Sequence, residues 1–112
     1  MRFEKRARTL LISAAALVFM ATSGCAHFEA ARLYRSGTQA LDRGDTDTAI
    51  FELEQAAVRA PRASEIQNHL GLAYAAAGRN GAALAAFERA VELDCENAAA
   101  QENLAAALAQ AR

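Results

Sequence analysis

Apolar residues recur three or four positions apart from about residue 28 onward, which is the spacing of amphipathic helices. Glycine, proline and short polar clusters interrupt this pattern and predict five helices, at about 28–43, 46–60, 64–77, 80–93 and 97–110. Runs of β-branched and aromatic residues that would favour strands are missing from the sequence. The pattern therefore predicts an all-α fold.

Polar residues at the breaks predict where these helices begin and end. Aspartate, serine and asparagine side chains accept hydrogen bonds from the first backbone N–H groups of a helix. We expect Asp45 or Thr46 to cap the second helix, with Ser64 and Asn80 capping the third and fourth. Pro61 cannot continue the second helix.

The helices form two pairs that repeat with a period of 34 residues. The first copy and its counterparts 34 positions later are Leu33 and Gln67, Gly37 and Gly71, Ala40 and Tyr74, Gly44 and Gly78, Ala49 and Ala83, Leu53 and Phe87, Ala56 and Ala90, and Pro61 and Cys95. Small residues are expected where the helices approach closely, with Tyr74 and Phe87 as large side chains between them. A period of 34 residues made of paired helices is typical of a solenoid.

The second copy resembles the tetratricopeptide repeat. The residues on its pattern positions are Leu70, Gly71, Tyr74, Gly78, Ala83, Phe87 and Ala90. Gln67 replaces the usual aromatic residue and Cys95 the terminal proline, while the first copy has Ser36, Ala40 and Leu53 for leucine, tyrosine and phenylalanine. Leu104, Ala105 and Leu108 begin a third, truncated copy.

The resemblance covers residues 30–112 and implies a short right-handed α-solenoid. Repeat 1 is expected at about 30–63, repeat 2 at about 64–97 and a C-terminal capping helix at about 98–111, within a domain spanning 26–112. Arrays of this kind usually need about three repeats for stability. We therefore expect marginal stability and self-association, as a homo-oligomer, or docking onto a partner.

Residues 1–25 have the layout of a bacterial signal peptide, with a basic start and an apolar run over 9–21 that predicts a hydrophobic signal or anchor helix. The segment Thr22-Ser23-Gly24-Cys25 resembles a lipobox, although Thr22 stands where leucine is usual. This resemblance implies cleavage before Cys25 and lipidation of its thiol. An uncleaved single-pass anchor in the inner membrane and an ordinary secreted protein remain alternatives.

Positive charge at the N-terminus places the repeat domain on the periplasmic side in the lipoprotein and anchor readings. No aspartate follows Cys25, which by resemblance to the sorting rule of enteric bacteria favours the outer membrane over the inner membrane. The expected localisation is therefore the bacterial cell envelope.

Tetratricopeptide repeats bind peptides in a concave groove formed by the first helix of each pair. The resemblance places these residues in that groove: Tyr34, Thr38, Leu41, Asp42, Glu65, Asn68, Leu72, Ala76, Glu102 and Ala106. The alternative is that a groove of two repeats is too short and that these positions are merely solvated. The clamp with which some relatives grip a terminal carboxylate is missing, since Tyr34, Thr38 and His69 occupy its places.

Charge and candidate chemistry exclude other function classes. From Cys25 onward the chain has eight arginines and twelve acidic residues. The resulting net charge of −4 argues against binding to nucleic acid. His27 and His69 lack metal-ligand spacing, and the acids at 42–54 lack the calcium-loop pattern. We find no catalytic constellation and expect no enzyme activity, cofactor or metal.

Cys95 has two possible roles, as a small residue in the turn between repeats or as a thiol that forms an intermolecular disulfide.

The sequence as a whole predicts an envelope lipoprotein that acts as a protein–protein interaction or assembly adaptor. The alternatives are a single-pass inner-membrane adaptor and, from another class, an accessory subunit of an envelope or cell-wall enzyme.

Overall fold

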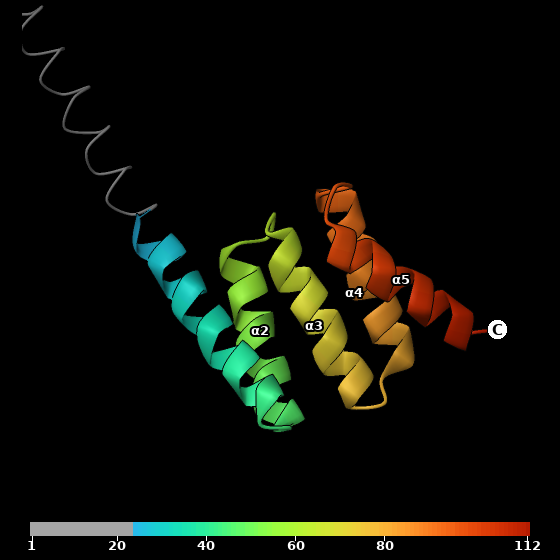
Figure 1. Cartoon of the computed structure of the whole chain (residues 1–112). Helices are drawn as coiled ribbons and strands as arrows, with labels where there is room; N and C mark the ends of the chain where they lie inside the picture. The colour runs from blue at the N-terminus through green and yellow to red at the C-terminus, as the bar shows by residue number, and fades with distance from the viewer. Residues whose placement is uncertain (1–23) are drawn as a thin grey trace, which may run out of the picture.

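The computed structural model describes residues 24–112, and these residues are helical without any strand (Figure 1). The first helix covers residues 24–42 and is followed by α2 (Thr46–Arg59), α3 (Ser64–Ala76), α4 (Asn80–Leu93) and α5 (Ala98–Gln110). The predicted all-α fold is confirmed. The predicted signal or anchor helix and its basic start lie outside the described residues.

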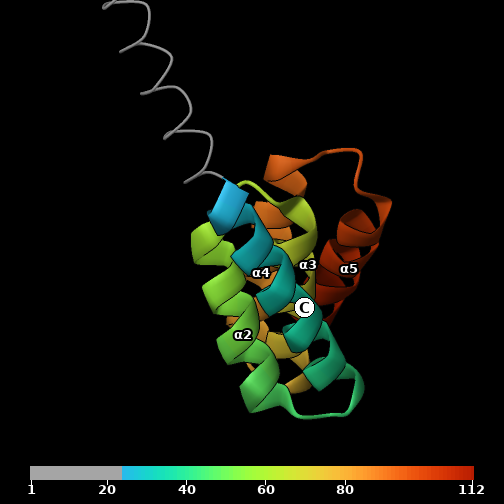
Figure 2. The same ribbon diagram turned by 90° about the vertical axis from the view of Figure 1, so that its left-hand side faces the viewer.

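Successive helices run antiparallel and stack in chain order (Figures 1 and 2). The first helix, α3 and α5 form one layer, and α2 and α4 form the other. Helix α3 is central, since it contacts α2, α4 and α5. Two helix pairs followed by a single helix match the predicted order of two repeats and a C-terminal helix.

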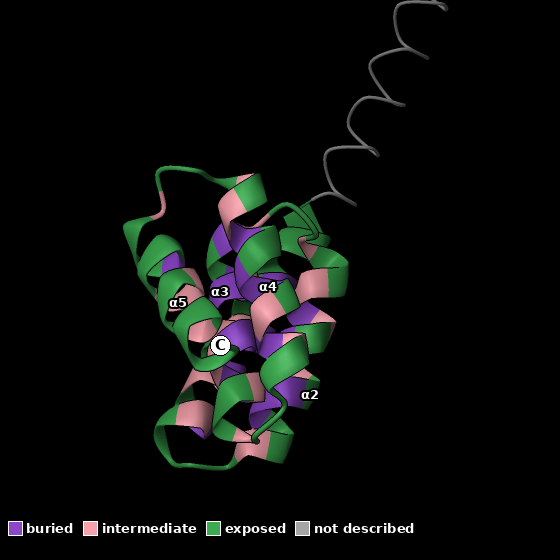
Figure 3. Cartoon of the chain, turned by 90° about the vertical axis from the view of Figure 1, so that its right-hand side faces the viewer, coloured by how far each residue is buried: buried purple, intermediate pink, exposed green. Residues whose placement is uncertain are grey.

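The core lies between the two layers and is built largely of alanine and leucine (Figure 3). Its main cluster joins the first helix, α2 and α3 through Ala40, Ala49, Ile50, Leu53, Leu70 and Ala73. A smaller cluster of Leu33, Ala56 and Ile66 lies beside it. The apolar periodicity of the sequence therefore corresponds to the buried faces of these helices.

Each repeat pairs a glycine on its first helix with a large side chain on its second. A Cβ atom added to Gly37 would lie 2.7 Å from Cγ of Leu53, and one added to Gly71 would lie 2.5 Å from the ring of Phe87. The missing side chain is what lets the two helices approach. The expected close contact is confirmed for Gly71 and Phe87. The expectation that Tyr74 also lies between α3 and α4 is wrong, because Tyr74 packs against the main core cluster and bonds to Glu54 on α2.

The turns within the two pairs depend on glycine. Gly44 has φ of +76° and Gly78 has φ of +75°, a conformation that a side chain disfavours. Backbone hydrogen bonds from Gly44 to Leu41 (2.9 Å) and from Gly78 to Ala75 (3.0 Å) close the preceding helices. Both glycines end their helices as predicted.

Two of the predicted helix caps are wrong. Asp45 does cap α2, accepting a hydrogen bond from the Thr48 N–H at 3.2 Å. Helix α3 instead begins after Ala63 and α4 after Arg79, and neither residue makes a side-chain cap. Ser64 and Asn80 lie one position inside their helices, and the Ser64 hydroxyl is used in a tertiary contact.

That contact joins three helices at the same end of the molecule. The Ser64 hydroxyl donates to the Ala90 carbonyl at 2.8 Å and accepts from Nδ2 of Asn97 at 2.9 Å. Asn97 also caps α5, because its Oδ1 accepts from the Ala100 N–H at 3.1 Å. One asparagine thus fixes the start of α5 against α3 and α4.

Replacing Asn97 with alanine is expected to lower the free energy of unfolding by about 1–2 kcal/mol, because it removes a helix cap and the donor to Ser64. Urea denaturation followed by circular dichroism measures this change. Asn80→Ala is the matched control, since Asn80 is exposed and caps nothing, and should change stability by less than about 0.5 kcal/mol. Equal losses in the two variants would contradict the role of Asn97.

Candidate functional site

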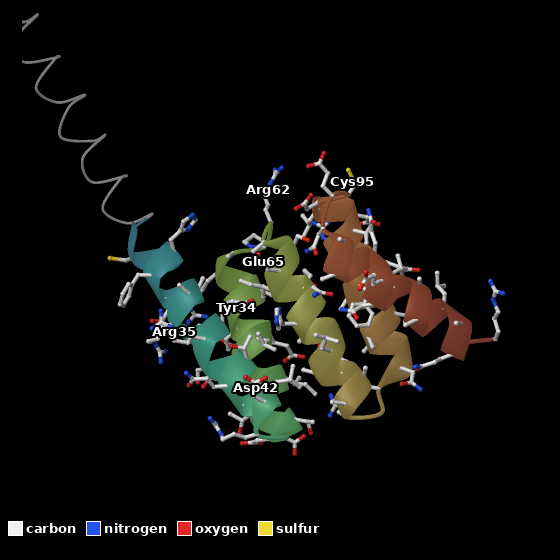
Figure 4. The ribbon with its side chains drawn as sticks, in the orientation of Figure 1. Tyr34, Arg35, Asp42, Arg62, Glu65 and Cys95 are labelled. Atoms are coloured by element: carbon white, nitrogen blue, oxygen red, sulfur yellow. The ribbon has the colours of Figure 1, made fainter. Side chains whose placement is uncertain are left out.

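The layer formed by the first helix, α3 and α5 carries the residues predicted for the concave groove. Figure 4 labels Tyr34, Asp42 and Glu65 among them. Their exposure differs. Those that are exposed are Asp42, Glu65, Ala76, Glu102 and Ala106, those that are half-buried are Tyr34, Thr38, Leu41 and Leu72, and Asn68 is buried. The predicted surface is therefore partly accessible and partly structural.

Tyr34 links the first helix to α3 through His69. The two rings meet edge to face at 86° with centroids 5.2 Å apart, and the Tyr34 hydroxyl lies 3.2 Å from Nδ1 of His69. Nδ1 also lies 3.0 Å from the Glu65 carbonyl oxygen, which can only accept, so we assign the hydrogen to Nδ1. Burial, followed by the charge of Glu65, raises the pKa of Tyr34. Tyr34 therefore contributes a neutral, positioned aromatic ring.

Asn68 makes the corresponding link from α3 to α5. Asn68 is only 4% exposed, and its Oδ1 accepts a hydrogen bond from Nδ2 of Asn103 at 2.9 Å. The oxygen of Asn68 is thus committed to holding α5. A contact of Asn68 with a bound peptide stays a prediction.

Neither the role of Asn103 nor the pairing of His69 with Tyr34 was predicted from the sequence. A signal was present, because both links join a residue to the one 35 positions later in the next repeat. Equivalent positions in the two repeats lie 34 residues apart in the sequence. The two residues that meet across neighbouring helices of the layer are instead 35 residues apart. Together the two links tie the three helices of the groove into one surface.

Two clefts open beside these links. One, of about 290 Å³, lies where the start of the first helix meets the α2–α3 turn, and its polar residues are His27, Tyr34 and Glu65. The other, of about 270 Å³, lies between α3, α4 and α5 and includes Leu72 and Ala106. Four of the ten predicted groove residues therefore line clefts. The other six line neither of these two: Thr38, Leu41, Asp42, Asn68, Ala76 and Glu102.

The two cysteines are exposed and unpaired in the described part of the chain. Cys25 lies near the start of the first helix, and Cys95 lies in the turn between α4 and α5 (Figure 4). Lipidation of Cys25 and an intermolecular disulfide at Cys95 stay predictions. Within residues 24–112, no three His, Cys, Asp or Glu side chains gather closely enough to hold a metal ion.

Tyr74 makes a further polar contact between repeats, on the side of α3 that faces α2. Its hydroxyl donates to Oε1 of Glu54 at 2.6 Å. Burial and then this carboxylate raise the pKa of Tyr74 to about 12. The unfolded chain has a tyrosine pKa of about 10, so the folded state keeps a proton that the unfolded state has already lost near pH 11.

The free energy of unfolding should therefore decrease as the pH rises from about 10 to about 12. Tyr74→Phe should make this decrease smaller. Thermal unfolding at several alkaline pH values measures the effect. A smaller slope will remain in the variant because the pKa of Tyr34 is also raised. Superimposable pH profiles for the variant and the natural chain would show that the contact between Tyr74 and Glu54 contributes nothing.

Comparison with known protein families agrees with this geometry. A model of the tetratricopeptide repeat matches residues 34–95, which is more than half of the chain. The chain belongs to the tetratricopeptide repeat family. No curated protein matches it.

Membership in the tetratricopeptide repeat family confirms the resemblance drawn from the two 34-residue copies. The repeats indicate a role in protein–protein interaction, and the tetratricopeptide repeat domain is a non-catalytic scaffold. Among the helices of residues 24–112, none is long and apolar enough to cross a membrane.

Proposed function

We propose that this protein is a membrane-anchored envelope lipoprotein that acts as an assembly adaptor, binding a segment of another envelope protein on its concave face. The observation that carries the proposal is the pair of polar links, Tyr34 to His69 and Asn68 to Asn103, which join the first helix, α3 and α5. A surface fixed in this way loses little conformational entropy when a peptide binds.

Exposed groups on this surface are suited to a peptide ligand. The cleft beside Tyr34 has a floor of alanine and isoleucine, with His27 and Glu65 at its polar edge. Such a mixture provides apolar contact area together with donors and acceptors for a peptide backbone. The polar edge carries one carboxylate, which favours a partner that brings a donor or a positive charge to this end.

The start of the first helix supports an anchor close to the domain. Helix is present from residue 24, so no flexible linker separates Cys25 from the repeats. In Figure 1 this start lies at the same end of the array as the α2–α3 and α4–α5 turns. A lipid on Cys25 would therefore hold that end, including Arg62 and Cys95, nearest the bilayer, with the groove running away from it (Figure 4).

A crosslinking pull-down from envelope membranes tests the adaptor proposal. The full-length tagged chain should recover an envelope partner, and Glu65→Lys should lose it because the exposed carboxylate borders the cleft. Glu88→Lys is the matched control, since it reverses an exposed charge on α4, outside the groove layer. Equal recovery by both variants would refute binding through the concave face.

Radiolabelled palmitate tests the anchor. Cys25→Ala should abolish labelling of the chain. Membrane retention without any labelling of the natural chain would instead support the single-pass inner-membrane adaptor. Recovery of a cell-wall hydrolase as the partner would favour the accessory-subunit alternative.

A further inference from the structure

Two strongly exposed apolar side chains lie at the end of the array where the first helix begins. Phe28 on the first helix is 75% exposed, and Val58 near the end of α2 is 74% exposed. The start of the first helix and the α2–α3 turn lie side by side there, because residues from both line the cleft of about 290 Å³. Phe28 follows Cys25 by three residues, so the two side chains project from the same face of the first helix.

Three arginines lie close to these side chains in the chain: Arg32, Arg59 and Arg62. Glu29 pairs with Arg32 at 2.7 Å. The pKa of Glu29 is lowered by this hydrogen bond and, to a smaller degree, by the charge of Arg59, which therefore lies near the first helix. Neither Arg59 nor Arg62 forms an ion pair with an acid of the described chain. Figure 4 shows Arg62 extending away from the α2–α3 turn.

This end is basic although the chain as a whole is acidic. Residues 24–35 and 58–62 together carry four arginines and one acid, Glu29, whereas the rest of the described chain carries four arginines and eleven acids. The other acids at this end belong to α3 and to the α4–α5 turn: Glu65, Asp94 and Glu96. The positive charge is therefore concentrated on the first helix and α2, where it favours an anionic partner.

A membrane would lie close to this end in both of the anchored alternatives. Helix is present from residue 24, and a lipid on Cys25 would be attached three residues, about 5 Å along the helix axis, from Phe28. An uncleaved span over the apolar run at 9–21 would end seven residues before Phe28. A phospholipid surface is therefore the anionic partner that either anchor would hold against this end.

We infer that this surface, here named the lipid-facing patch and made up of Phe28, Arg32, Val58, Arg59 and Arg62, lies on the bilayer and binds its anionic phospholipids. Phe28 and Val58 enter the boundary between headgroups and acyl chains, and the arginines bind phosphate groups above it. The contact orients the array, with the acidic α4–α5 turn directed away from the anionic surface. The inference deepens the proposed function and rests on it for the membrane anchor.

Single tryptophans test the lipid-facing patch, because the chain has no tryptophan of its own. Phe28→Trp and Val58→Trp each place an indole in the patch. Phe51→Trp is the matched control, since Phe51 is also exposed on α2 but lies seven residues, about 10 Å along the helix, before Val58.

Each variant is isolated as the producing bacterium processes it and is reconstituted into vesicles of equal parts phosphatidylcholine and phosphatidylglycerol. The phosphatidylcholine carries bromine on its acyl chains, and quenching of the indole fluorescence by bromine reports contact with the bilayer. Quenching should be at least about twofold greater for Phe28→Trp and Val58→Trp than for Phe51→Trp, because only the patch enters the lipid boundary.

Removing arginines tests the binding of anionic lipid. Arg59→Gln combined with Arg62→Gln should reduce the quenching of Val58→Trp by about half in the mixed vesicles and change it little in vesicles of phosphatidylcholine alone. Arg79→Gln combined with Arg112→Gln is the matched control, because it removes the same charge from exposed positions outside the patch. The control pair should keep the quenching.

Equal quenching at the three tryptophan positions, or equal losses from the two arginine pairs, would overturn the inference. Palmitate labelling and the pull-down separate its failure from that of the proposed function. A labelled chain without preferential quenching keeps the lipoprotein anchor and refutes the patch, whereas preferential quenching without any recovered partner supports the patch and refutes the adaptor. A natural chain that is neither labelled nor held by the vesicles would overturn both the anchor and the patch.

Discussion

Replacing Phe87 with alanine is expected to lower the free energy of unfolding by about 3–5 kcal/mol, which is a large part of the stability of a small repeat domain. Phe87 is 3% exposed, and its ring fills the space left by Gly71. It also lines the cleft between α3, α4 and α5, so truncation enlarges an existing cavity.

Phe51→Ala is the matched control for this variant. The substitution is chemically identical, but Phe51 on α2 is 62% exposed. Its removal should change the free energy of unfolding by less than about 0.5 kcal/mol. Chemical denaturation of both variants measures the difference, and comparable losses would show that Phe87 is not the residue that holds the second repeat together.

The architecture could be predicted from the sequence because it depends on contacts that repeat. Gly37 with Leu53 and Gly71 with Phe87 make the same close approach 34 residues apart. Gly44 and Gly78, which both have positive φ, end the first helix of each pair. Each of these features is local to a helix pair, so the pattern of residue types within one copy is enough to place it.

Side-chain hydrogen bonds between helices could not be predicted in the same way. The Ser64 hydroxyl suits an N-cap by residue type, yet it donates to Ala90 because α4 ends beside it. Asn68 fits a groove position by pattern, yet Asn103 of α5 takes up its oxygen. Such choices depend on how far one helix is shifted along the next, and a repeat period does not contain that shift.

The cleft between α3, α4 and α5 illustrates a further limit. A cavity arises from side chains that are too small, and alanine at a helical position normally indicates only good helix propensity. Ala75, which lines the cleft, becomes informative once Leu41, 34 positions earlier, is known to pack against the main core cluster. Differences between aligned copies, rather than the shared pattern, therefore point to the part of the groove that is specific to this chain.

Glycine-to-alanine substitutions at Gly71 and Gly81 should have opposite effects. A Cβ at Gly71 would lie 2.5 Å from the Phe87 ring, so Gly71→Ala should destabilise the domain by about 1–3 kcal/mol even after the gain in helix propensity. Gly81 lies in α4 with nothing within 4 Å of the added Cβ and without a positive φ. Gly81→Ala should stabilise the domain by up to about 1 kcal/mol.

Thermal and urea denaturation of the two variants give the sign of each change. A second-site variant identifies the cause, because Phe87→Ala removes the ring atoms that the new methyl group meets. The free-energy loss of Gly71→Ala should therefore be smaller in a Phe87→Ala background than in the natural chain, a coupling expected of residues in direct contact. Additive losses would mean that the glycine is needed for its backbone and not for the approach of α4 to α3.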